Sequence, residues 1–99
     1  MVKIVVIVTE TVDQFNKYIS ILLEGMVTGK NIASSKYNVV QYNNTRYIWY
    51  GGGVDIRKFA GMNIFDIIFV GDMSWLQNKG KDIKMLEYRK MRGNMYGKD

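Results

Sequence analysis

Two short runs of the sequence are apolar on both faces that a β-strand would present. Val2–Val8 reads VKIVVIV, and Ile64–Val70 reads IFDIIFV, which only Asp66 interrupts. Runs of this kind are typical of strands in the covered centre of a sheet. Such strands are usually parallel neighbours, because a crossover helix packs over the sheet between them. The two runs therefore predict a sheet with a buried centre, whose faces the rest of the chain has to cover.

The other elements follow from local patterns. Apolar residues between Val12 and Thr28 recur at helical spacing, directly after a Thr11–Gln14 capping box. Residues 37–42 and 46–50 predict a hairpin, because asparagines such as Asn43 and Asn44 tolerate the backbone of a tight turn. A second long helix is predicted over residues 81–92. Residues 73–78 predict a helical turn capped by Asp72, and residues 54–60 fit either a short helix or a short strand.

We therefore predict a single α+β domain over residues 1–99, built in two layers. Its mixed sheet has about four strands, at residues 2–8, 37–42, 46–50 and 64–70. Its two main helices span residues 12–28 and 81–92, and residues 93–99 form a flexible tail. The chain of 99 residues is long enough for one small core.

Composition excludes several kinds of chemistry. The chain has no cysteine and no histidine, which excludes disulfides, thiolate nucleophiles, cysteine zinc sites and triads built on imidazole. The stretch Gly25–Asn31 (GMVTGKN) is not a phosphate-binding loop, since its spacing is one residue short and it lies at the C-terminal end of a predicted helix instead of at an N-terminus. We expect a protein that is not an enzyme and needs no cofactor. No apolar run is long enough to span a membrane, so we also expect an intracellular location.

The predicted hairpin is apolar on both sides. Val40, Tyr42, Tyr47 and Trp49 share one face, and Tyr37, Val39, Ile48 and Tyr50 share the other. Either this chain covers both faces, or one aromatic face is left for a partner. The second alternative makes Tyr42, Tyr47, Trp49 and Tyr50 candidate interface residues, with a second copy of the chain as the expected partner.

Three features near the predicted strand ends have both a structural and a functional interpretation. Gly51–Gly53 is more typical of a plain loop than of an anion-binding nest. Glu10 and Asp72 would meet at the carboxyl edge of parallel strands, where they are weak candidates for a metal site, since two acids are a poor ligand set. Asp66 should be paired or exposed, and Arg57, Lys58 or Arg46 could pair with it.

Positive charge gathers near the C-terminus. Residues 79–99 hold seven of the fourteen Lys and Arg residues, against three acids. On the predicted helix, Lys81, Lys84, Tyr88 and Arg92 lie on one face. A basic stripe with one tyrosine suits phosphate contacts and base stacking, although a solvated surface helix has the same composition. These residues are candidate nucleic-acid contacts.

Two resemblances add to these predictions. The start VKIVVIVTETVDQF and the centre RYIWYGGGVDIRKFAGMNIFDIIFVGD, in a chain of this length, resemble a small protein of filamentous double-stranded DNA viruses of hot-spring archaea, the lipothrixvirus and rudivirus groups. This resemblance implies a heat-tolerant viral protein in the host cell cytoplasm, and it brings no activity. Residues 46–72 are also similar to the acidic-motif region of RecA-like ATPases, with Asp72 matching the acid. Met73 stands where those enzymes have a second acid, and the phosphate-binding loop is absent as well, so a working ATPase is excluded.

Two functions follow as expectations. The first is a viral accessory protein that associates with itself through the aromatic hairpin of residues 37–50. The alternative is a nucleic-acid-binding protein that uses the basic helix of residues 79–92.

Overall fold

Strand β1 (Lys3–Val8) is the centre of the fold. The computed structural model describes residues 2–24 and 38–96, with side chains for residues 2–23 and 38–90. One mixed sheet has the strand order β2-β3-β1-β4, in which β1 pairs in parallel with β3 and β4, and β2 pairs antiparallel with β3. The other strands are β2 (Val39–Tyr42), β3 (Thr45–Tyr50) and β4 (Asp66–Phe69). The α+β class, the four-strand mixed sheet and the two main helices are as predicted.

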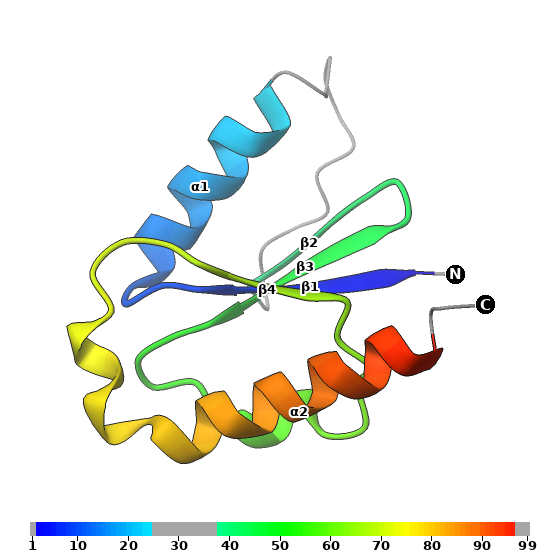
Figure 1. The fold of residues 1–99 in the computed structure, drawn as a ribbon. Coiled ribbons are helices and arrows are strands. Elements are labelled where there is room, and N and C mark those ends of the chain that lie inside the picture. Colours follow the sequence, from blue (N-terminus) through cyan, green and yellow to red (C-terminus); the bar gives the residue numbers. More distant parts are fainter. Residues whose placement is uncertain (1, 25–37, 97–99) are drawn as a thin grey trace.

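The sheet is covered on both faces. Helix α1 (Val12–Glu24) lies over one face and helix α2 (Gly80–Tyr96) over the other (Figure 1). Alternate residues of β1 supply the two cores: Val5 and Ile7 pack with α1, whereas Val6 and Val8 pack in the cluster that contains Leu86 of α2. The domain therefore has three layers, and the predicted two-layer arrangement is wrong. Both faces of the sheet are apolar, so each face needs its own cover.

Helix α1 begins at the predicted capping box. The Thr11 N–H donates to Gln14 Oε1 at 3.1 Å, and the Gln14 N–H donates to Thr11 Oγ1 at 3.3 Å. Phe15, Ile19 and Leu23 form its buried stripe, with exposed fractions of at most 3%. The predicted end of this helix at residue 28 lies outside the described residues.

The hairpin forms around Asn43-Asn44, and Asn43 has the positive φ of 54° that the turn requires. The pairs Val39–Ile48 and Val40–Tyr47 give the two faces that the alternation predicts. Val40 and Trp49 lie in the core under α1, and Ile48 and Tyr50 lie in the core that includes Leu86. Tyr37 lies outside the described residues.

The ambiguous segment 54–60 contains a short helix, and the predicted helical turn at 73–78 also forms. Residues 56–59 form the 3₁₀ helix η2 (Ile56–Phe59), and residues 74–78 form the 3₁₀ helix η3 (Ser74–Asn78). The Asp72 carboxylate accepts the Ser74 N–H at 2.9 Å, but the N-cap of η3 is Met73, so the predicted cap at Asp72 is one residue too early. Helix α2 continues past residue 92 to Tyr96, so residues 93–96 are helix where the sequence predicted a tail.

Gly51 is fixed by packing at the end of β3. Its backbone is buried, and a β-carbon there would overlap both the Trp49 ring and the Thr9 carbonyl. The indole Nε1 of Trp49 donates to Thr9 Oγ1 at 2.8 Å, which holds the ring in that place. This packing supports the loop interpretation of the glycine triplet and gives its first glycine a structural role.

We expect Gly51→Ala to lower the free energy of unfolding by about 3 kcal/mol, because backbone and a buried ring would both have to move. Gly52→Ala is the matched control, since its β-carbon would lie 3.4 Å from the Glu10 carbonyl oxygen, an ordinary contact. Urea denaturation of both variants measures the difference. Equal stabilities would contradict this account of Gly51.

The open edge of β4 is protected by Asp66. Its Oδ1 accepts the N–H of Ile67 at 2.8 Å and lies 3.2 Å from Lys90 Nζ of α2. Lys90 is a partner that the sequence did not suggest, whereas two of the expected partners bond elsewhere: Arg57 pairs with Asp55, and Arg46 donates to Gln41. The unpaired N–H groups of an edge strand can hydrogen-bond to a strand of another chain, and a charged side chain at the edge is one way to prevent this pairing. Asp66 therefore occupies an edge donor that a second chain could otherwise use.

We expect Asp66→Ala to increase self-association, because it frees the Ile67 N–H and leaves Phe65 and Phe69, which are 47% and 45% exposed, beside an unguarded edge. Sedimentation over a concentration series measures the change. Asp13→Ala, at an exposed position on α1, removes the same charge and is the control. An Asp66→Ala variant that sediments like wild type would contradict the guarding role.

Candidate nucleic-acid interface

The outward face of α2 carries the predicted basic residues. Leu86 is fully buried, and Ile83 packs against the same core. These two residues therefore define the side of α2 that faces the sheet. Lys81, Lys84 and Tyr88 lie on the opposite side and are exposed. The structure therefore brings these three residues together on one face, as predicted. The side chain of Arg92 lies outside the part that the structure describes.

A shallow depression of about 620 Å³ opens where η3 joins α2. Its lining holds three lysines against one aspartate, and consists of residues 77–82 and Lys84. Within the described residues, Arg57–Asp55 and Lys90–Asp66 form ion pairs, and these three lysines take no part in either. The depression adds Lys79 to the candidate contacts. The sequence placed Lys79 in the basic segment 79–92 but not on the helix face, because the break at Asn78–Gly80 hid its position relative to the helix.

The aspartate in the depression, Asp82, is hydrogen-bonded to a side chain of strand β3. The hydroxyl of Tyr50 donates to Asp82 Oδ2 at 2.6 Å. Tyr50 itself is fully buried, and Trp75 stacks on it with ring centroids 6.2 Å apart. Burial, together with the hydrogen bond to Asp82 and its charge, raises the pKa of Tyr50 well above its ordinary value. This contact ties the start of α2 to β3 and so fixes where the lysines stand.

The four candidate interface residues of the hairpin are buried or half-buried in the folded chain. Trp49 is 7% exposed and Tyr50 is fully buried, so the folded chain leaves neither ring for a partner. Tyr42 and Tyr47 are half-buried and pack against the core under α1. Burial, and then the neighbouring Tyr18, raise the pKa of Tyr47. The hairpin was expected either to be covered by its own chain or to leave an aromatic face for a partner. Trp49 and Tyr50 are covered by their own chain.

Glu10 and Asp72 lie at the carboxyl edge of the sheet, as expected. Glu10 follows β1 and Asp72 follows β4, and these two strands are parallel neighbours. The Asp72 carboxylate accepts hydrogen bonds from the Ser74 N–H and hydroxyl, and these lower the pKa of Asp72. Within the ranges that the structure describes, no three acids lie together in a group that could hold a metal ion. The geometry gives these two carboxylates no further ligand.

No family model matches the chain, and no curated protein or solved structure shows significant similarity to it. The resemblance to proteins of archaeal viruses therefore stays a prediction. Among the described residues, no helix has the length and apolar content needed to cross a membrane.

We expect Tyr50→Phe to destabilise the fold by about 1–3 kcal/mol at neutral pH, because it removes a hydrogen bond to a charged group. The raised pKa of Tyr50 means that its neutral form stabilises the fold fully below its ordinary pKa of 10.0, and that this stabilisation is lost as the pH rises above that value. Wild type should therefore lose stability above pH 10 more steeply than Tyr50→Phe. Urea denaturation across alkaline pH tests this, with Tyr88→Phe as the exposed control, and parallel pH profiles for wild type and Tyr50→Phe would contradict it.

Proposed function

We propose that the protein is a viral accessory protein that binds nucleic acid through the outward face of α2. The observation that carries the proposal is a set of three lysines without ion-pair partners, the exposed Lys81 and Lys84 and the half-buried Lys79, which line one depression next to the face that holds Tyr88. Lysines without ion-pair partners are free to replace the counterions of phosphates. The net charge of +5 favours encounter with a polyanion in the same way.

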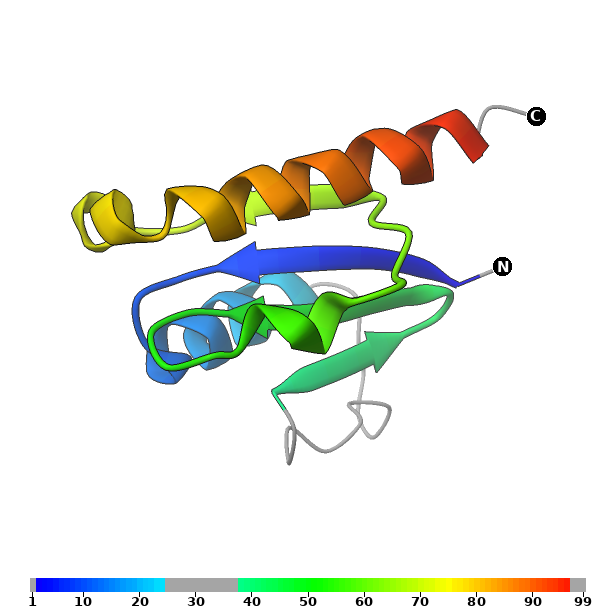
Figure 2. The same cartoon turned by 90° about the horizontal axis from the view of Figure 1, so that it is seen from below.

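The position of α2 in the fold supports this proposal. Figure 2 shows α2 running along β4 on the outside of the molecule, with no other element beyond it. Its inner side is held by Leu86 in the core and by the Lys90–Asp66 pair. A helix fixed in this way presents its outer lysines on a rigid support, which reduces the ordering that binding would require.

Self-association through the hairpin ranks second. Burial removes Trp49 and Tyr50 from that surface, and leaves Tyr42 and Tyr47 half-buried. Two half-buried tyrosines that already pack against their own core offer less apolar area than the interface the sequence predicted.

We expect Lys81→Glu/Lys84→Glu to weaken binding of a labelled oligonucleotide by about tenfold or more, and to lower the slope of log affinity against log salt by about 2. Fluorescence anisotropy over a salt series, with single-stranded and duplex probes, measures both quantities. Circular dichroism checks that the fold is kept.

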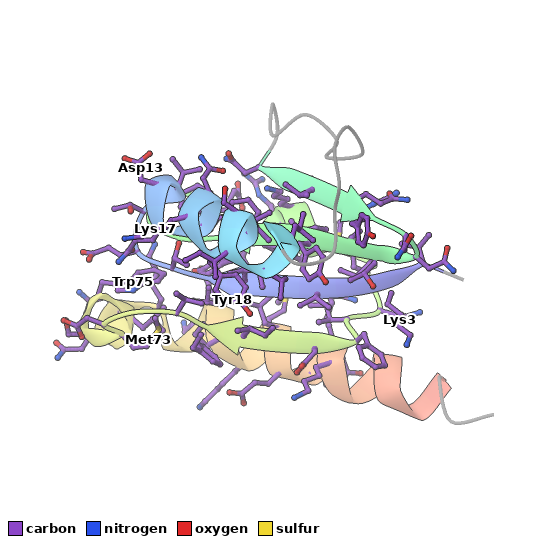
Figure 3. The ribbon with its side chains drawn as sticks, turned by 90° about the horizontal axis from the view of Figure 1, so that it is seen from above. Lys3, Asp13, Lys17, Tyr18, Met73 and Trp75 are labelled. Carbon is purple, nitrogen blue, oxygen red and sulfur yellow. The ribbon has the colours of Figure 1, made fainter. Side chains whose placement is uncertain are left out.

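The matched control is Lys3→Glu/Lys17→Glu, which changes the net charge equally. Figure 3 shows Lys17 on α1, on the face of the sheet opposite α2, and Lys3 at the start of β1. If the control weakens binding as much as the α2 variant, only net charge matters and the proposed interface is wrong. If wild type shows no salt-dependent binding, the proposed function is wrong.

A further inference from the structure

Tyr88 differs from the other tyrosines whose side chains the structure describes. It is 52% exposed, whereas Tyr50 is fully buried and Tyr18, Tyr42 and Tyr47 are half-buried against the core under α1. Those four have a packing role that accounts for them. Tyr88 lies on the side of α2 away from Leu86, so core packing does not account for its ring.

The surroundings of Tyr88 suit a nucleobase. Long helical side chains lean toward the helix N-terminus, so the ring lies over the turn that holds Lys84 and Met85. Met85 is 44% exposed and extends the apolar surface beside the ring. Lys84 and Lys81 stand one and two turns before Tyr88, on the same face and toward the lysine-lined depression. A flat aromatic ring at the end of a row of cations is the arrangement that stacks a base while its phosphates meet the charges.

We infer that the α2 face binds single-stranded nucleic acid, with one base stacked on Tyr88 and the adjoining phosphates at Lys84, Lys81 and Lys79. This inference rests on the proposed function and adds to it the strandedness of the ligand. Bases of a duplex are stacked on one another and present only their edges in the grooves, so the ring of Tyr88 gains no stacking partner there. The preference for a single strand therefore depends on Tyr88, and the salt dependence depends on the lysines.

The test compares Tyr88→Ala, Tyr88→Phe and wild type on a single-stranded oligonucleotide and on its duplex, by fluorescence anisotropy at one salt concentration. We expect Tyr88→Ala to weaken single-strand binding by about 5- to 150-fold, the range of one base–aromatic stack. Tyr88→Phe keeps the ring and should bind the single strand as wild type does. Neither variant should change duplex binding. A fluorescent adenine analogue in the strand should be quenched by wild type and by Tyr88→Phe, but less by Tyr88→Ala.

Each other outcome overturns a different statement. If Tyr88→Ala binds the single strand like wild type while the Lys81→Glu/Lys84→Glu variant does not bind, stacking on Tyr88 is wrong and the basic interface stands. If Tyr88→Ala weakens single-strand and duplex binding equally, or if Tyr88→Phe is as weak as Tyr88→Ala, the ring does not select single strands. If wild type binds neither probe in a salt-dependent way, the proposed function fails together with the inference.

Discussion

The fold depends on the burial of β1 on both of its faces. Successive side chains of a strand point to opposite sides, so Val5 and Ile7 enter one core while Val6 and Val8 enter the other. All four side chains are at most 7% exposed. A central strand of this kind needs a neighbouring strand on each side and a covering layer above and below. The chain supplies β3 and β4 as neighbours and α1 and α2 as layers, which accounts for most of the residues that the structure describes.

The aromatic residues of β3 link this centre to the layers around it. Trp49 bonds to Thr9 at the end of β1, and this packing is possible because Gly51 has no side chain. Tyr50 points to the other side, where it bonds to Asp82 at the start of α2 and stacks with Trp75 of η3. The hydrogen-bonding groups of both rings are satisfied within the chain, as is usual for buried tyrosine and tryptophan. The hairpin aromatics therefore serve the core, and the surface open to partners lies elsewhere.

The features of that surface follow from the same contacts. Because Leu86 and Asp82 fix one side of α2, the lysines and Tyr88 are directed to the opposite side. Two acids near these lysines are engaged in other ways: Asp82 accepts from Tyr50, and Asp66 pairs with Lys90 while it blocks the edge of β4. The positive charge at the start of α2 thus results from an arrangement that also stabilises the fold.

Local pattern was enough to predict the strands, the capping box of α1, the turn at Asn43 and the shared outer face of Lys81, Lys84 and Tyr88 on α2. These features depend on residues close in sequence, and periodicity reports which side chains share a face. Periodicity does not report what covers that face. The Trp49–Thr9 bond joins residues 40 apart in the chain, and the Tyr50–Asp82 bond joins residues 32 apart. The third layer, the burial of Trp49 and Tyr50, the pairing of Asp66 with Lys90 and the inclusion of Lys79 in the basic face were therefore decided by the tertiary structure, since each depends on which distant segment packs against a strand.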